Sequence, residues 1–155
     1  EALGLFFGAP AAGYFLGNFF TGRFSSRIGL DAMIFWGLAL NLFGLTASLA
    51  VFYNGMGSAI SFFGFMTFVG FGNGLSIPNA TAGMLARRPD LAGAASGLGS
   101  AIMIAGGAAL SALAGAVLTP TSGATPLLWL MWSSVAAGVI CMIYVKKRHR
   151  SIQTS

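Results

Sequence analysis

The stretch Ala32–Phe52, AMIFWGLALNLFGLTASLAVF, contains no charged residue over 21 positions. A helix needs roughly 20 apolar residues to cross the hydrocarbon core of a bilayer, so this stretch has the length of one membrane span. Further apolar stretches of similar length lie at about residues 3–21, 59–84, 91–118 and 126–145. Together they predict an all-α integral membrane protein with about five transmembrane helices.

The composition of the chain supports a membrane environment. Hydrophobic residues make up 56% of the 155 residues, charged residues only 7%, and the mean hydropathy is +0.82. A soluble domain carries about 25% charged residues, so a water-facing surface could not be covered here. The apolar stretches are continuous and lack the alternation of membrane β-barrel strands, which leaves helices as the spanning elements.

The basic residues are predicted to lie on one side of the membrane. They follow the first, third and fifth stretches and are absent from the other two connections: Arg23, Arg27, Arg87, Arg88, Lys146, Lys147, Arg148 and Arg150. Because positive residues collect on the cytoplasmic side, we expect a cytoplasmic carboxy terminus with a basic tail at 146–155. The net charge of +5 is then a sign of membrane topology and not of nucleic-acid binding. We expect a multi-pass protein of a cell membrane, as in the bacterial inner membrane.

This topology places the start of the chain, Glu1, on the outer side without a signal segment. An odd number of upstream spans would explain that placement. We therefore expect the chain to be a fragment of a longer protein whose amino-terminal part is missing.

No catalytic or metal-binding set is visible in the sequence. The acids Glu1, Asp31 and Asp90 lie at or beyond the span ends, His149 lies in the basic tail, and Cys141 stands alone in the last stretch. We therefore expect no enzyme activity, no cofactor and no metal site. A carboxylate inside the membrane would be the natural proton carrier, so any proton coupling would use residues of the missing part.

Small residues at a spacing of four mark the first, third and fourth stretches: Gly13/Gly17, Gly70/Gly74, Gly93/Gly97 and Gly107/Ser111/Gly115. Such residues let helix backbones approach closely in lipid. We predict that these three are packed inner helices and that the bulkier second and fifth stretches face lipid. Pro10 and Pro78 lie inside the first and third stretches and predict bends, which would serve either a change of shape or simple curvature.

Polar and large apolar residues share faces of the predicted inner helices. The candidate substrate-binding residues are Tyr14, Asn18, Phe65, Met66, Asn73, Ser96, Ser100 and Met103. A mostly apolar wall with a few polar anchors is typical of small-molecule sites. Hydrogen bonding between helices is the alternative role for each of the polar ones.

The segment Gly22–Gly29 places Arg23 and Arg27 four residues apart and ahead of a glycine. The arginines can cap helix carbonyls or pair with an acid on a neighbouring helix, and Gly29 permits a tight turn. Plain anchoring at the positive side is the alternative role of this loop.

These residues resemble those of a known family. The stretch from Leu16-Gly17-Asn18 through Arg23, Arg27 and Gly29 resembles the loop motif of the major facilitator superfamily, in its degenerate second copy. The resemblance implies a conformational or gating role for Arg23, Arg27 and Gly29. Ser26 stands where that motif has an acid, and Leu30 and Asp31 stand where it has basic residues. The segments 76–82 (SIPNATA) and 92–98 (AGAASGL) resemble helices ten and eleven of Bcr/CflA-like drug:proton antiporters.

The resemblance implies that the five stretches are helices eight to twelve of a twelve-helix secondary transporter. Its implied activity is proton-coupled export of small amphipathic compounds or drugs by alternating access. The implied partners are the small-molecule substrate, protons, the lipid bilayer and the missing amino-terminal part. A major facilitator carrier of a sugar or other metabolite, or a non-transport membrane scaffold subunit, is the alternative.

Overall fold

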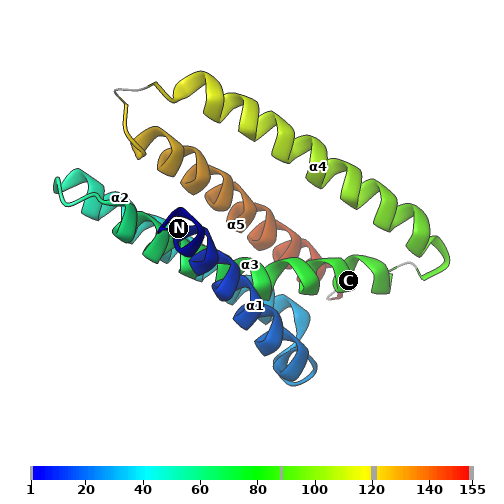
Figure 1. Ribbon diagram of the computed structural model, residues 1–155. Coiled ribbons are helices and arrows are strands. Elements are labelled where there is room, and N and C mark those ends of the chain that lie inside the picture. Colours follow the sequence, from blue (N-terminus) through cyan, green and yellow to red (C-terminus); the bar gives the residue numbers. More distant parts are fainter. Residues whose placement is uncertain (1, 88, 120–121, 154–155) are drawn as a thin grey trace.

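The computed structural model describes residues 2–87, 89–119 and 122–153. These residues form five α-helices and one short 3-10 helix (Figure 1): α1 (Ala2–Ile28), α2 (Leu30–Tyr53), α3 (Ala59–Arg87), η1 (Pro89–Leu91), α4 (Ala92–Val117) and α5 (Thr125–Gln153). The described chain contains no strand, and the all-α prediction is confirmed. Glu1 and Arg88 lie outside the described residues, as do the side chains of His149 and Arg150.

Four of the helical segments are long and apolar enough to cross a membrane: α2, α3, η1 with α4, and α5 as far as Arg148. These lengths and compositions are those of a multi-pass membrane protein. The first helix is not among the four, so its role as a fifth span stays a prediction. The carboxy-terminal ends of α1, α3 and α5 lie on one side of the molecule, and the α2–α3 and α4–α5 connections lie on the other (Figure 1). Which side is cytoplasmic stays a prediction.

The helices extend beyond the apolar stretches at the basic end. α1 continues through the predicted loop to Ile28, and α5 is helical through most of the predicted tail, to Gln153. A single residue, Gly29, separates α1 from α2, with φ 91° and ψ 149°. Glycine adopts this positive φ at little cost, so the tight turn is confirmed whereas the longer loop is wrong. Arg27 lies in the last turn of α1, where a positive side chain complements the helix dipole.

α3 is the centre of the fold, with α1 and α2 packed on different faces of it. Helix positions turn by about 100° per residue, so Gly72 points roughly away from Gly70 and Gly74. A Cβ atom on Gly70 or Gly74 would collide with α1, and one on Gly72 would collide with α2. Glycines on both faces therefore let α3 lie close to two neighbours at once.

The α1–α3 interface is held by glycines whose Cα hydrogens point at backbone carbonyls of the facing helix. The glycine–carbonyl pairs are Gly13–Thr67, Gly17–Phe71, Gly70–Pro10 and Gly74–Tyr14. Contacts of this Cα–H···O type contribute about 0.5–1 kcal/mol each. The predicted close packing of the first and third helices is confirmed.

The α2–α3 interface uses the same device. A Cβ on Gly37 would lie 2.5 Å from the carbonyl oxygen of Gly72, and Gly72 faces the carbonyl of Gly37 in return. The prediction that the second stretch faces lipid is therefore wrong for one side of the helix, which packs against α3. Its bulky residues, such as Phe35, Trp36 and Phe43, are exposed and lie on the outer side. A stripe of small and polar residues is buried on the inner side: Gly37, Asn41, Gly44 and Ser48.

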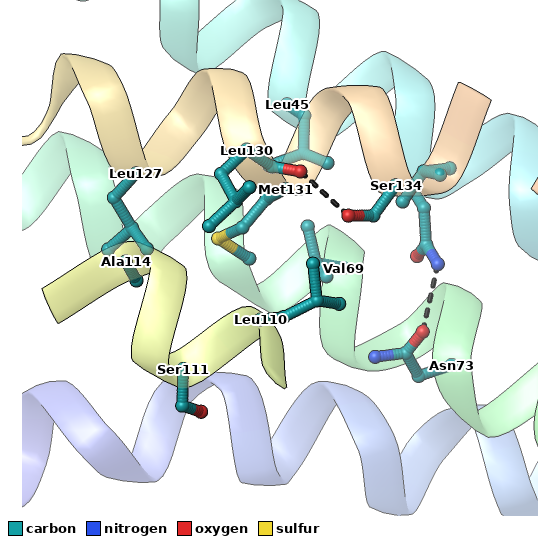
Figure 2. A pocket seen from close by; sticks show the side chains of 12 residues that line it. Leu45, Val69, Asn73, Leu110, Ser111, Ala114, Leu127, Leu130, Met131 and Ser134 are labelled. Atoms are coloured by element: carbon teal, nitrogen blue, oxygen red, sulfur yellow. Dashed lines mark hydrogen bonds between the residues drawn. The ribbon is translucent and has the colours of Figure 1, made fainter. Parts of the chain in front are cut away.

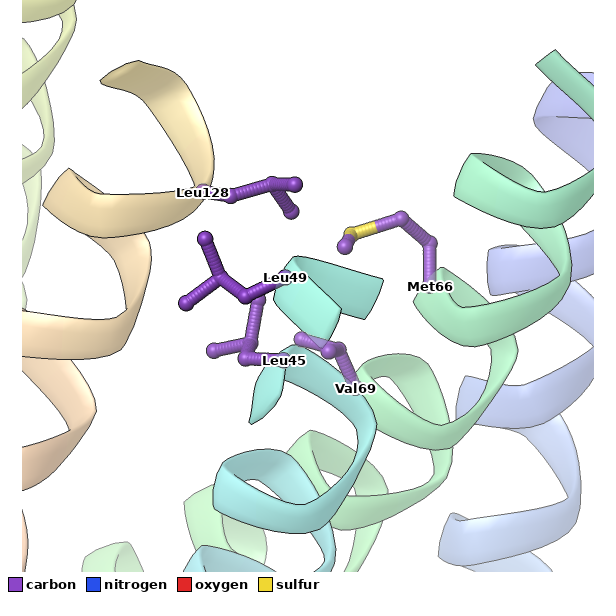
Figure 3. Close-up of a cluster of buried hydrophobic side chains, with 5 residues drawn as sticks. All are labelled: Leu45, Leu49, Met66, Val69 and Leu128. Carbon is purple, nitrogen blue, oxygen red and sulfur yellow. The ribbon is translucent and has the colours of Figure 1, made fainter. Parts of the chain in front are cut away.

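The hydrophobic core lies where the amino-terminal part of α5 meets α2 and α3 (Figure 3). It consists of five buried side chains: Leu45, Leu49, Met66, Val69 and Leu128. Two indole N–H groups hold α5 against α2, because Trp129 donates to the Tyr53 hydroxyl and Trp132 to the Thr46 hydroxyl, both at 3.0 Å. The amino-terminal part of the fifth stretch, predicted to face lipid, therefore packs against α2 and α3.

α4 differs from the other helices because none of its residues is buried. It stands apart from the α1–α3–α2 layer in Figure 1 and touches the rest only through parts of α3, η1 and α5. Nothing within 4 Å would meet a Cβ on Gly93, Gly97, Gly107 or Gly115. The prediction that the fourth stretch is a packed inner helix is therefore wrong for this structure.

Candidate functional site

A cavity of about 310 Å³ lies where α2, α3, α4 and α5 meet (Figure 2). Apolar side chains form most of its wall: Leu45, Val69, Leu110, Ala114, Leu127, Leu130, Met131 and Val135. Four polar residues complete it: Asn41, Asn73, Ser111 and Ser134. Leu45 and Val69 also belong to the buried core, so one wall of the cavity is anchored in the best-packed part of the molecule.

Two asparagines from neighbouring helices form the polar part of the cavity wall. The Asn41 amide nitrogen donates to the Asn73 side-chain oxygen at 2.9 Å. Asn41 is only 2% exposed, and its side-chain oxygen has no hydrogen-bond partner in the described chain. That oxygen lies against Gly72, where any side chain would displace it. Glycine is thus needed at position 72 for two reasons: it allows the close approach of α2, and it leaves the space that the Asn41 side chain occupies.

Asn73 is the polar group best placed to meet a ligand. It is half-buried, and within the described chain its amide nitrogen has no acceptor. Figure 2 shows this nitrogen turned away from the Asn41 bond, toward the part of the cavity where Leu110 lies. The Ser134 hydroxyl, by contrast, donates to the Leu130 carbonyl of its own helix at 2.8 Å. The cavity is therefore an open apolar hollow with one unpaired amide donor in its wall.

The eight predicted substrate-binding residues do not gather around one cavity. Only Asn73 lines the cavity described above. Ser96, Ser100 and Met103 lie together on α4 and line a separate space of about 190 Å³ shared with the end of α3. The structure thus splits the predicted wall between two places.

The remaining four predicted residues lie away from both spaces. Tyr14 and Asn18 belong to α1, and the Asn18 amide donates to the Tyr14 carbonyl at 2.8 Å within that helix. Met66 is buried in the hydrophobic core. Phe65 is half-buried, and its carbonyl faces Gly44 of α2. Their contacts in this structure are those of packing residues.

Pro78 interrupts the hydrogen bonding of α3, and a side chain of α1 supplies a replacement hydrogen bond. Proline has no N–H, so the carbonyl four residues earlier, that of Gly74, lacks its helical donor. The Thr21 hydroxyl of α1 donates to this carbonyl at 2.9 Å. The buried Asn79 amide in turn contacts the Thr21 oxygen at 3.2 Å and the Leu75 carbonyl at 2.6 Å. The bend predicted at Pro78 stays a prediction, and the structure shows a polar link between α1 and α3 at this position.

The other predicted motif residues lie at the surface or in interfaces. Arg23 and Arg27 are exposed on the last turns of α1, and no ion pair involves them in the part of the chain that the structure describes. Pro10 lies inside α1, and its carbonyl faces Gly70. Gly29 forms the break between α1 and α2.

Several cavity residues come from the two helices predicted to face lipid. Asn41 lies on α2, and Leu127, Leu130, Met131 and Ser134 lie on α5. One signal could have revealed the first of these: Asn41 is the only amide side chain in an otherwise apolar stretch. Placing an amide against hydrocarbon without a partner is costly, so this residue required an inner position. The α5 residues carried no such signal.

The arrangement is suited to binding and carries no visible reactive group. Among the described residues, no cluster of three or more His, Cys, Asp or Glu side chains could hold a metal ion. Comparisons with protein-family models, with curated proteins and with solved structures found no match. The cavity and its lining residues are therefore the basis for assigning a function.

Proposed function

We propose that this chain forms part of a secondary transporter that moves small amphipathic compounds across a membrane. The observation that carries the proposal is the cavity between α2, α3, α4 and α5, with the Asn41–Asn73 pair in its wall. Ligand sites are typically apolar enclosures with a few polar groups that fix orientation. A cavity of this kind among helices long enough to span a membrane suits a compound with an apolar body and a polar group.

The composition of the wall favours an amphipathic substrate over a sugar. Only four of its residues are polar, and three of those already hydrogen-bond within the protein. A sugar carries many hydroxyl groups, and each would lose hydrogen bonds to water on entering such a wall. Asn73 offers one amide donor, which suits a ligand with a single acceptor such as a carbonyl or ether oxygen.

The proline inside α3 supports transport by alternating access. Pro78 weakens α3 five residues after Asn73, and proline is a common cause of helix kinks. The resemblance to the major facilitator superfamily supports the same proposal, with the remaining helices and any proton-coupling acid in an amino-terminal part. In that arrangement the substrate would lie between two helical halves near the middle of the membrane.

The test is the substitution Asn73→Leu in the full-length protein, with export measured for a panel of amphipathic dyes. We expect the order of preferred compounds to change while the amount of folded protein stays near normal, since the residue is only half-buried. Asn18→Leu is the matched control, because its amide bonds within α1 and lies away from the cavity. It should leave the order of preference unchanged.

Two results would contradict the proposal in different ways. Loss of folded protein in Asn73→Leu alone would make the Asn41–Asn73 pair a structural contact. A full-length wild-type protein that folds and exports none of the compounds would favour a scaffold subunit.

A further inference from the structure

A second cavity, of about 250 Å³, lies between the start of α2 and the end of α5, away from the cavity described above. Five residues line it: Phe35, Met142, Ile143, Lys146 and Lys147. We call it the α2–α5 groove. Three of its residues have hydrocarbon or thioether side chains, and the two lysines come about one turn after Met142 and Ile143 on α5. The groove therefore changes from apolar to cationic along its length.

The two lysines are free to bind an anion. Among the described residues, neither Lys146 nor Lys147 takes part in an ion pair or hydrogen bond, and both side chains are exposed. The nearest acid in sequence on α2 is Asp31, one turn before Phe35, and it pairs with neither lysine. Arg148 follows them on the same helix and adds positive charge nearby.

The position of the groove selects the class of anion. It lies at the end of the molecule where α1, α3 and α5 all carry their basic residues (Figure 1). At the end of a spanning helix, lysines extend their ammonium groups to the level of the lipid headgroups while their stems stay in apolar surroundings. Phe35 and Ile143 are each 46% exposed and would face acyl chains directly. A free phosphate ion would leave this apolar wall uncovered.

We propose that the α2–α5 groove binds one anionic phospholipid, with the phosphate between Lys146 and Lys147 and an acyl chain against Phe35, Met142 and Ile143. Basic pockets between membrane helices bind anionic lipid headgroups in this way. The bound lipid tightens the carboxy-terminal part of α5 against the start of α2. This is the end of α5 that lacks the buried core contacts of Leu128.

The test is a lipid titration of the full-length protein by native mass spectrometry, with phosphatidylglycerol and phosphatidylcholine as probes. We expect one phosphatidylglycerol to be retained in preference to phosphatidylcholine. Each lysine near an anionic surface contributes on the order of 1 kcal/mol, so Lys146→Gln with Lys147→Gln should weaken retention about thirtyfold. The double Lys→Arg variant keeps the charge and should retain the lipid.

The matched control is Arg23→Gln with Arg27→Gln, which removes the same charge from the same end of the molecule but outside the groove. It should leave retention unchanged. Phe35→Ala should weaken retention several-fold, whereas the adjacent Trp36→Ala should not, because only Phe35 lines the groove. Excess inorganic phosphate should not displace the lipid.

Three outcomes would overturn the proposal. Equal losses in the lysine and arginine variants would show general attraction to the basic end. Displacement by phosphate would show an anion site with no lipid component. Equal retention of both lipids by the wild-type protein would show that the groove has no headgroup preference.

Discussion

α3 and α4 are both rich in glycine, yet α3 is packed on two faces and α4 has no buried residue. The glycines of α3 face helices that also carry small residues at matching heights, such as Gly17 opposite Gly74 and Gly37 opposite Gly72. The glycines of α4 face open space, except Gly99, where a Cβ would lie 3.0 Å from the end of the Met84 side chain. Small-residue spacing therefore permits close packing, but a complementary partner decides whether it occurs.

The hydrogen bonds of α3 and α4 differ in the same way as their packing. α3 is tied to its neighbours by Thr21 on one side and by Asn41 on the other. In the described chain, no hydrogen bond is found between an α4 side chain and another helix. The polar links and the glycine contacts thus stabilise the same three-helix layer, formed by α1, α2 and α3.

The largest effect is expected from a bulky residue at the α1–α3 contact. Gly74→Leu would push a side chain into the backbone of α1, since a Cβ there already lies 2.5 Å from the Tyr14 carbonyl oxygen. Backbone cannot move aside as a side chain can, so we expect a loss of about 3 kcal/mol in the free energy of unfolding. Thermal unfolding in detergent measures the change. Gly97→Leu on α4 is the control and should leave the midpoint of thermal unfolding nearly unchanged. Similar losses of stability in both variants would mean that α4 is packed against other helices in solution.

A smaller loss in the free energy of unfolding is expected from Leu128→Ala, which tests how strongly α5 packs against α2 and α3. Leu128 is fully buried in the core, whereas Leu113 of α4 is 52% exposed. In lipid, the unfolded helix also has apolar surroundings, so the cost is mainly lost packing and the cavity left behind. We expect about 2 kcal/mol for Leu128→Ala and almost none for Leu113→Ala, measured by the same unfolding assay. Equal losses of stability in the two variants would contradict the conclusion that α5 is packed in the core whereas α4 is not.

The link between Thr21 and Gly74 should contribute about 1 kcal/mol, the typical net value of a hydrogen bond. Thr21→Val keeps the shape of the side chain and removes the donor. Pro78→Ala restores the helical N–H, so Thr21→Val should cost less in that background than in the wild type. A double-mutant cycle on unfolding free energies measures this coupling. Additive effects would show that the Thr21 hydroxyl does not replace the donor that Pro78 lacks.

The helical fold was predictable from the sequence because its signal is local: apolar stretches long enough to span a membrane. Helix packing was only partly predictable. Gly13/Gly17 and Gly70/Gly74 were identified correctly, but the same spacing in α4 has no partner. In α2, bulky residues such as Trp36 obscured the small-residue stripe, because the two types occupy opposite sides of one helix.

The candidate site was less predictable than the fold, because it depends on which faces of four helices meet. Asn73 could be identified from one helix alone, as an amide in an apolar stretch. Its partner Asn41 carried the same signal, but the assignment of α2 to the lipid side concealed it. The cavity residues of α5, such as Met131, are ordinary apolar residues, and only their position in space distinguishes them.

The smallest expected effect concerns the open face of α4. Alanine is favoured over glycine inside a helix by up to about 1 kcal/mol, mainly because glycine has more freedom in the unfolded chain. At Gly97 a Cβ meets nothing within 4 Å, so Gly97→Ala should leave stability unchanged or raise it slightly. At Gly17 a Cβ would lie 2.9 Å from the Gly74 Cα, so the same change there should be destabilising. The opposite signs make this pair a sensitive test, since helix propensity acts equally at both sites and only packing differs. A destabilising Gly97→Ala in the full-length protein, measured by thermal unfolding, would show that another helix covers this face of α4. Both helices would then pack through their glycines, and they would differ only in which helices they pack against.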